Sequence, residues 1–491
     1  MKKQTLWIKS LVLLLAMTML LSILAACQTA GTGEGTTEKP AAATTTVVTE
    51  NTDENGLYYD DLPEDLNFNR IFRVLGCQQQ AYQFQGTNAE DDDPIQRAIF
   101  ERNMTVEERM GIEFEWDLVS GVWGSRETFL TAIQTACDGG TPHDAIIAYN
   151  LVPPVVAVRG YAANLYGTRY IDLSAPWWPS VYQREMLLND QLYSLEESND
   201  HGVLLSMLAV FFDNDRLESR NLESPYDLVA KNEWTIEKLA EMIKDTYEDF
   251  DNDQKVSAGD IFGMCTASNS KIDAWFYGCG YRFSEIQNGE VVSLVGDSKL
   301  NDALDLLTGF MNNQDVYQYD TSQGKMFYEK RAYFYSGGVY LAMGTKEDSI
   351  NFGVVPQPKL NSEQERYYTH LSNEHDSWCV PYNVKDMDCT SAVMECMASE
   401  SYRQIGPLYF DTYLKLRLAP DERLADMYDL IRDGITFDFI YLYTCVYSNS
   451  PKEVFKKCYL SPTSNQWASS YAQNKGAWDS AFQQIIDTYN K

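Results

Sequence analysis

The sequence predicts an α/β protein built from two lobes. Roughly 430 of the 491 residues follow a polar N-terminal segment, and this exceeds the ~250–300 residues at which a single hydrophobic core stops growing. The first part of that body alternates strand and helix patterns, whereas the part after residue 401 shows mainly helix patterns. We therefore expect a parallel sheet in the first lobe and a helical C-terminal region.

Alternation of strand and helix patterns opens the body. Residues 70–75 read as a strand, and a helix is predicted over 94–110, with Pro94 in the first turn, where proline is tolerated. An alternating strand at 112–116, a helix at 127–137 and a buried strand at 144–149 follow. This β-α-β-α-β order predicts parallel strands covered by helices.

The remaining elements are expected at wider intervals. Helices are predicted at 235–247, 300–311 and 390–398, strands at 350–356 and 378–381, and further helices at 403–418, 421–432 and 478–489.

The N-terminus has the pattern of a secretion signal. Lys2 and Lys3 form a short basic region ahead of an apolar run at 11–23, which is shorter than the ~20 residues that a membrane-spanning helix needs. The run ends in Leu24-Ala25-Ala26-Cys27, which resembles a bacterial lipobox and predicts lipidation of Cys27. An ordinary signal peptide with a chance cysteine is the alternative. We expect a lipoprotein signal peptide at 1–26 and a disordered tether at 27–66, since residues 28–55 have little to bury.

Composition narrows the functional classes. A net charge of −32 argues against binding to nucleic acids and to anionic lipids. The nine cysteines after Cys27 are odd in number and form no CxxC pair, so buried free thiols are expected. The GxSxG and HExxH signatures of hydrolases are missing, and SxxK occurs only without its partner motifs, so we expect no enzyme activity, although a glycosidase carboxylate pair has no sequence signature.

The segment 249–260 resembles a calcium-binding EF-hand loop. Its aspartates Asp249, Asp251 and Asp253 stand at positions 1, 3 and 5, Lys255 offers its backbone carbonyl at position 7, and Asp260 closes the loop. Gln254 replaces the usual turn glycine, and Asp260 replaces a longer glutamate. We expect a structural calcium ion that also offsets the C-terminal dipole of the preceding helix. A solvated acidic loop is the alternative.

Aromatic and polar residues near loops are candidates for ligand contact. Trp177, Trp178, Trp275 and Trp378 lie in or beside predicted loops, and aromatic rings stack on the apolar faces of sugars, although core packing explains such residues equally well. Asp376, beside Trp378, could accept hydrogen bonds from sugar hydroxyls or form a rim charge.

Several motifs, taken in their order along the chain, resemble those of the extracellular solute-binding lipoproteins of ABC importers. The branch concerned is usually linked to sugars and oligosaccharides. The motifs are RNMTVEER at 102–109, PWW at 176–178, QLY at 191–193, FFDND at 211–215, PYDLV at 225–229, EWT at 233–235 and FGVVPQPK at 352–359.

This resemblance implies a periplasmic-binding-protein-like fold, with a ligand cleft between two lobes that close by hinge motion. The expected lobes comprise 67–205 plus 372–400, and 206–371 plus 401–491. In this family the carboxyl end of the third strand commonly offers ligand contacts, which makes Tyr149 and Asn150 candidates in this sequence.

The function implied is capture of a carbohydrate, an oligosaccharide in our reading, and delivery to a membrane permease by a monomeric protein anchored on the extracytoplasmic face. A surface-anchored carbohydrate-active hydrolase and a lipoprotein that reports its ligand to a sensor kinase are the alternatives.

Overall fold

The computed structural model describes residues 51–344, 350–417, 422–461 and 466–491. The predicted signal peptide, Cys27 and residues 28–50 of the predicted tether lie outside the described residues. Residues 51–66 are described, and Asp60 and Leu62 are buried among them, so the expected disorder up to residue 66 is wrong. Within those residues, no helix combines the length and apolar character needed to cross a bilayer.

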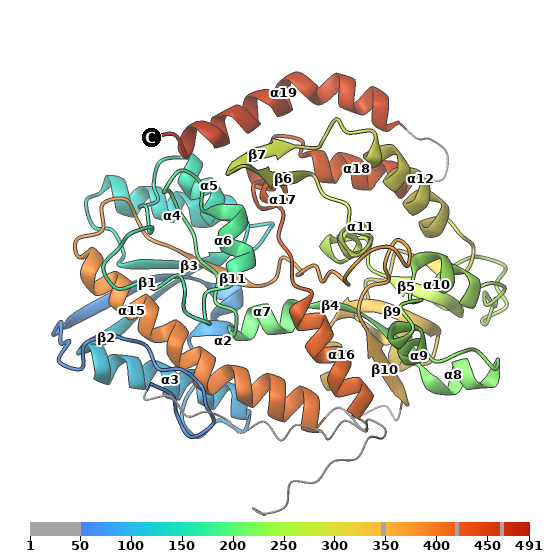
Figure 1. Cartoon of the computed structure of the whole chain (residues 1–491), viewed down its shortest axis with the longest axis horizontal. Coiled ribbons are helices and arrows are strands. Elements are labelled where there is room, and N and C mark those ends of the chain that lie inside the picture. The colour runs from blue at the N-terminus through green and yellow to red at the C-terminus, as the bar shows by residue number, and fades with distance from the viewer. Residues whose placement is uncertain (1–50, 345–349, 418–421, 462–465) are drawn as a thin grey trace, which may run out of the picture. The chain divides into compact units, whose positions relative to one another are not determined.

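Four strands form the first sheet, in the order β11-β3-β1-β2 (Figure 1). The strand β1 (Arg70–Cys77) pairs in parallel with both β2 (Ile112–Val119) and β3 (Ala145–Tyr149). The fourth strand, β11 (Asp376–Cys379), returns from much later in the chain and runs antiparallel to β3. The predicted parallel sheet is therefore confirmed, with one antiparallel strand added at its edge.

The helix α3 (Pro94–Met110) begins and ends where its capping residues dictate. The Asp93 carboxylate accepts a hydrogen bond from Ile95 N over 2.8 Å, and Gly111 ends the helix in the left-handed region at φ 61°. The helix packs against β2 and against α15 (Met387–Glu400), while α4 (Arg126–Asp138) joins β2 to β3. The predicted helices in this region are confirmed.

Five strands form the second sheet, in the order β10-β4-β9-β5-β8, and Figure 1 labels β4, β5, β9 and β10 of these. Their bounds are β4 Leu208–Asp213, β5 Phe262–Thr266, β8 Val316–Tyr317, β9 Ala332–Gly338 and β10 Phe352–Val355. The strand β5 is parallel to β8 and β9, whereas β4 is antiparallel to β9 and β10. Every residue of β4 and β5 is buried, as expected for central strands covered on both faces.

Helices dominate the C-terminal region, as predicted. After two π-helical stretches, Ser401–Ile405 and Pro407–Arg417, come α16 (Glu422–Asp433), α17 (Phe439–Leu442), α18 (Pro451–Tyr459) and α19 (Trp467–Thr488). The helix α12 (Lys299–Met311) packs against α18.

The remaining elements are short helices and one hairpin. They are η1 (Gln78–Gln80), α2 (Ala81–Phe84), α5 (Pro153–Val158), α6 (Ser180–Met186), α7 (His201–Ser206), α8 (Asn214–Ser219), α9 (Pro225–Ala230), α10 (Ile236–Met242), η2 (Ser270–Ile272), α11 (Asp273–Gly278), β6 (Ser284–Gln287), β7 (Glu290–Ser293), α13 (Lys325–Tyr328), α14 (Leu341–Gly344) and η5 (Thr444–Val446).

One predicted helix is shorter than its sequence pattern indicated. The helix α10 begins after Thr235, whose side chain accepts a hydrogen bond from Lys238 N, but it ends at Met242 instead of residue 247. The Asp315 carboxylate accepts hydrogen bonds from the backbone N–H groups of residues 245, 246 and 247, which holds this segment in a turn. The predicted dipole effect on the acidic loop is therefore wrong, since the helix ends well before Asp249.

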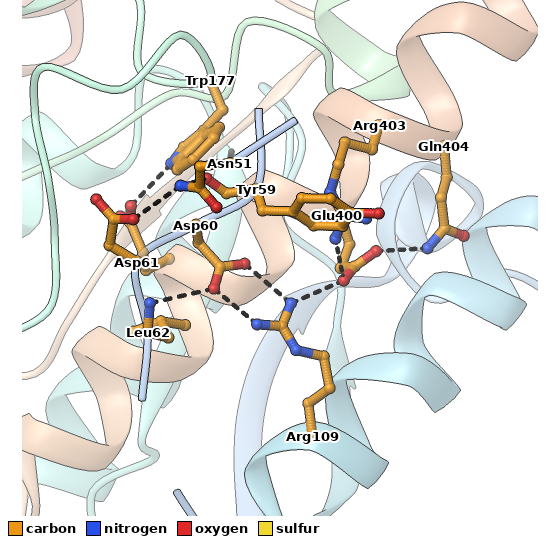
Figure 2. Close-up of polar contacts among 11 residues, drawn as sticks. Asn51, Tyr59, Asp60, Asp61, Leu62, Arg109, Trp177, Glu400, Arg403 and Gln404 are labelled. Carbon is orange, nitrogen blue, oxygen red and sulfur yellow. Dashed lines mark hydrogen bonds and ion pairs between the residues drawn. The ribbon is translucent and has the colours of Figure 1, made fainter. Parts of the chain in front are cut away.

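The N-terminal segment is fixed to α3 and α15 by an arginine shared between two carboxylates. The Arg109 guanidinium donates to both oxygens of Asp60, over 2.6 and 2.9 Å, and to Glu400 Oε1 over 2.8 Å (Figure 2). The Asp60 side chain is fully buried, and its contacts with Arg109 hold the pKa of this carboxyl below its usual value, against the opposing effect of burial. We call this group the Asp60–Arg109–Glu400 clamp.

All nine described cysteines are free thiols, and every one except Cys445 is buried. This agrees with the expectation from the sequence.

Candidate functional site

A cavity of about 520 Å³ lies where strands from both sheets end. Trp123 follows β2, and Tyr149 is the last residue of β3. Residues 268–270 follow β5, and Tyr319 follows β8. In α/β folds, ligands bind beyond the carboxyl ends of the strands, so this cavity is the candidate binding site. Its full lining is Trp123, Tyr149, Ser268, Asn269, Ser270, Tyr319, Asn373, Glu374, Lys452, Glu453, Lys456, Lys457 and Leu460.

Two aromatic side chains in this lining are accessible to solvent. Trp123 is 42% exposed and Tyr319 is 54% exposed. The Arg126 guanidinium lies 4.6 Å from the centre of the Trp123 ring and donates to its backbone carbonyl, which fixes the indole in place. Exposed rings of this kind offer stacking surfaces for the C–H faces of a sugar.

The helix α18 supplies most of the charge in the cavity. Lys452 Nζ lies 2.9 Å from Asp273 Oδ2 and 3.1 Å from Glu453 Oε1, while Lys456 Nζ lies 2.9 Å from the same glutamate oxygen. The adjacent lysines lower the pKa of Glu453, so this carboxylate is ionised at neutral pH although burial opposes the charge. The ion pairs to Asp273 therefore fix α18, which lines the cavity, against α11.

The segment before β11 forms another wall. Asn373 accepts a hydrogen bond from the Tyr441 hydroxyl over 2.9 Å, and Glu374 lies one residue further along. Because Asp376 pairs with Tyr149 in the antiparallel ladder, this segment enters the sheet at the edge where β3 ends.

The residues predicted for ligand contact have different positions. Tyr149 lines the cavity, and its burial raises the pKa of the phenol, which keeps the hydroxyl protonated as a hydrogen-bond donor. Asn150 is buried and is not part of the lining: its backbone N–H donates to His375 O over 3.1 Å, and its side-chain oxygen has no partner among the described residues.

The four predicted tryptophans do not line this cavity. Trp177 and Trp178 are buried and donate their indole N–H groups to Glu395, over 3.1 and 2.8 Å. Trp275 packs against Phe310 with ring centres 4.8 Å apart. Trp378 lies within β11 and is buried. In each case the core-packing interpretation fits the observed contacts.

Asp376 is also buried within β11 and away from the cavity lining. Burial, followed by the nearby Asp200 carboxylate, raises the pKa of Asp376 well above its usual value.

The structure adds residues that the sequence reasoning missed, above all Trp123, Tyr319 and the lysines of α18. For Trp123 a signal was available, because it follows the strand at 112–119 just as Tyr149 ends the strand at 145–149. The lysines had no such signal, since a short amphipathic helix carries lysines on solvent faces in most proteins.

A second cavity of about 500 Å³ lies between the β6–β7 hairpin and α19. None of the parallel strands of the two sheets ends there. We therefore take the cavity at the strand ends as the site.

The predicted calcium loop brings its aspartates together. Carboxylate oxygens of Asp249, Asp251 and Asp253 lie within 4.8 Å of one another. Gln254, at the position where such loops carry glycine, adopts the left-handed conformation that glycine favours, with φ 63°. A methyl group on Gly259 would lie 2.3 Å from Asp251 Oδ2, so glycine is required there for the carboxylate to fit.

Asp260 holds the loop closed. Its buried carboxylate accepts hydrogen bonds from Phe250 N over 3.2 Å and from Ser257 N over 2.9 Å. One oxygen of Asp249 is buried and has no hydrogen-bond partner among the described residues. The carboxylate oxygens of Asp249, Asp251 and Asp253 fit a hard cation such as calcium. The Asp260 carboxylate fixes the loop conformation through its backbone hydrogen bonds.

Comparison with solved structures places this architecture among known folds. A sugar-binding protein MalE from Xanthomonas citri superposes with a TM-score of 0.55 at 12% identity, covering 86% of this chain and 97% of that one. The chain has the fold of the maltose-binding proteins.

Two further proteins show the same maltose-binding fold. The GacH receptor of Streptomyces glaucescens, solved unliganded and with acarbose, gives a TM-score of 0.53 at 13% identity, covering 86% of this chain and all of that one. MalE of Listeria monocytogenes, solved with maltose, gives 0.52 at 14% identity, covering 86% and 98%. No family model and no curated protein matches the sequence. The expected two-lobed α/β fold is thus confirmed.

Proposed function

We propose that this protein captures a carbohydrate outside the cytoplasm and delivers it to the permease of an ABC importer. The observation that carries this proposal is the cavity at the strand ends of both sheets. Its lining combines the exposed rings of Trp123 and Tyr319 with polar side chains. The structures of similar fold described above include complexes with maltose and acarbose, which supports a saccharide ligand.

The lining residues divide the work of recognition. Trp123 comes from the first sheet and Tyr319 from the second, so closure of the lobes brings both rings onto one ligand. Asn269 and Asn373 offer amide groups to sugar hydroxyls, and the protonated Tyr149 hydroxyl adds a donor.

Calorimetry and thermal shift with a panel of glycans test this proposal. A ligand that binds only the folded state raises the melting temperature by mass action. Trp123→Ala and Tyr319→Ala should each weaken binding roughly tenfold or more, because each removes a stacking surface. Tyr166→Ala, which removes another exposed aromatic ring outside the cavity, is the matched control.

Two results would contradict the proposal. If no glycan shifts the melting temperature, capture of a carbohydrate is wrong. If the glycan is recovered cleaved after incubation, the protein is a hydrolase, whereas recovery of intact glycan supports a binding protein.

We further propose that the mature chain begins at Cys27, which carries the lipid that anchors a monomeric protein to the extracytoplasmic face of the cell membrane. The lipobox-like Leu24-Ala25-Ala26-Cys27 sequence supports this location. Cys27→Ser should release the protein from the membrane fraction, and mass spectrometry of the N-terminal peptide should find a lipidated cysteine in the unmodified chain. A non-lipidated N-terminus after residue 27 would contradict the proposal.

We also propose that the loop 249–260 binds a structural calcium ion. Asp249, Asp251 and Asp253 would supply carboxylate oxygens, and Lys255 its backbone carbonyl. The buried, unpartnered Asp249 oxygen supports this proposal, since such an atom gains most from a cation.

Titration of metal-stripped protein with calcium tests the loop directly. Calcium should raise the melting temperature of the unmodified protein, and Asp249→Ala should abolish this response. Absence of calcium uptake at millimolar concentration would show that the loop is only an acidic turn, and would leave the transport proposal intact.

A further inference from the structure

The cavity carries an excess of positive charge in a strongly acidic protein. Three lysines, Lys452, Lys456 and Lys457, line it together with two carboxylates, Glu374 and Glu453. The whole chain, by contrast, has a net charge of −32. A local excess of lysines is therefore a property of this site and not of the composition.

The ion pairs of α18 use all but one of these lysines. Lys452 and Lys456 share Glu453 and the buried Asp273, so these four groups neutralise one another. Lys457 is exposed in the cavity lining and has no ion-pair partner among the described residues.

The remaining carboxylate does not offset this charge. Glu374 accepts a hydrogen bond from Ser372 Oγ over 3.2 Å and lies 3.9 Å from Lys271 Nζ. With Lys271 and Asp273 included, four lysines face three carboxylates around the site.

The two paired lysines are nearly buried. The Lys452 side chain is only 4% exposed and the Lys456 side chain only 10% exposed, and their ion pairs offset the cost of burying each ammonium group. Lys457 is therefore the ammonium group of the lining that a negatively charged ligand group can reach without breaking an ion pair between described residues.

We infer that the captured carbohydrate is acidic and that Lys457, supported by Lys456, binds its negatively charged group, a uronate carboxylate or a sulfate ester. This inference rests on the proposed function and adds the chemical class of the ligand. An ammonium group is a compact charge that serves either anion, so the two sources are separated by experiment. Trp123 and Tyr319 would bind the apolar faces of the same saccharide.

Calorimetry with three trisaccharides tests the inference: trigalacturonate, a sulfated galactan trisaccharide and neutral maltotriose. At low ionic strength, at least one acidic trisaccharide should bind roughly tenfold tighter than maltotriose or more, since hydrogen bonds to charged groups contribute more than neutral ones. The preference should shrink at high ionic strength, because salt screens charges that solvent reaches. The tighter of the two acidic ligands identifies the anion.

Variants separate a charge effect from a structural one. Lys457→Gln should remove the preference for the acidic ligand, because it weakens acidic binding much more than maltotriose binding. Glu374→Gln, which removes a negative charge from the same cavity, should strengthen acidic binding. Lys299→Gln, at an exposed lysine outside the cavity lining, should change neither.

The inference is overturned if maltotriose binds as tightly as both acidic ligands, or if Lys457→Gln weakens neutral and acidic binding equally. If no saccharide binds at all, the proposed function itself is contradicted, and the acidic-ligand inference falls with it.

Discussion

The indole of Trp178 donates a hydrogen bond to Glu395 Oε2 over 2.8 Å. Trp177 donates to the other oxygen of the same carboxyl group over 3.1 Å, and Asp172 N donates to Oε2 over 3.2 Å. Burial raises the pKa of Glu395 to about 8, although these donors lower it. The two tryptophans therefore join the loop at 172–178 to α15, and the geometry assigns them to stability instead of ligand contact.

Trp178→Phe tests this assignment. The variant keeps an aromatic ring but removes the N–H donor, which should cost about 1–3 kcal/mol of unfolding free energy because a buried carboxyl oxygen loses the shorter of its two hydrogen bonds. Ligand affinity should stay unchanged, as measured by calorimetry alongside denaturant unfolding. Trp123→Ala should show the reverse pattern, with weaker binding and nearly unchanged stability. A Trp178→Phe protein with unchanged unfolding free energy but weaker ligand binding would contradict this assignment and indicate that Trp178 contacts the ligand.

Glu395 should also make stability depend on pH. In the unfolded chain a glutamate ionises near its ordinary pKa of 4.5, whereas in the folded protein burial raises the pKa to about 8. Between these values the folded state holds the proton that the unfolded state has released, so stability falls as pH rises through this window. Glu395→Gln should remove that part of the pH dependence. Denaturant midpoints of both proteins from pH 4.5 to pH 8 provide the measurement, and parallel curves would contradict the prediction.

Loss of Arg109 should destabilise the protein strongly. Arg109→Ala leaves the buried carboxylates of Asp60 and Glu400 close together without their shared cation, which should cost about 3 kcal/mol or more. Arg169→Ala is the matched control, since its 3.0 Å ion pair with Asp388 is solvent-exposed and should contribute less than about 1 kcal/mol. Equal unfolding free energies for the two variants would show that the clamp stabilises the protein no more than an exposed ion pair does.

Glycine at position 254 should raise both the stability of the protein and the calcium affinity of the acidic loop. Gln254 has φ 63°, a conformation that costs a side chain other than glycine about 1 kcal/mol. Gln254→Gly should therefore raise the unfolding free energy by a fraction of this amount and strengthen calcium binding. Asn252→Gly serves as the control, because asparagine tolerates the same left-handed conformation at φ 59° and less strain is relieved. A lower calcium affinity in Gln254→Gly would contradict the prediction.

Local patterns predicted the elements well where capping and periodicity agree. The helix α3 has the predicted bounds, because Asp93 and Gly111 define its ends within the local sequence. The helix α10 was predicted too long, since the group that ends it, Asp315, lies far along the chain.

The site was harder to predict for the same reason. Tyr149 was found through its position at the end of a strand, but whether a tryptophan faces a cavity or a distant acceptor depends on tertiary contacts. Glu395, more than 200 residues from Trp178, decides that question for Trp177 and Trp178. The boundaries of the two lobes stay a prediction.

The Asp60–Arg109–Glu400 clamp has a mechanical consequence. A pull on the N-terminus, as a membrane anchor would exert, reaches the folded body at Asp60 and passes through Arg109 and Glu400 into α3 and α15. Both helices belong with the first sheet, and no clamp residue lines the cavity. If the N-terminus is anchored in this way, the tension would enter the protein through elements of the first sheet and away from the residues that line the cavity.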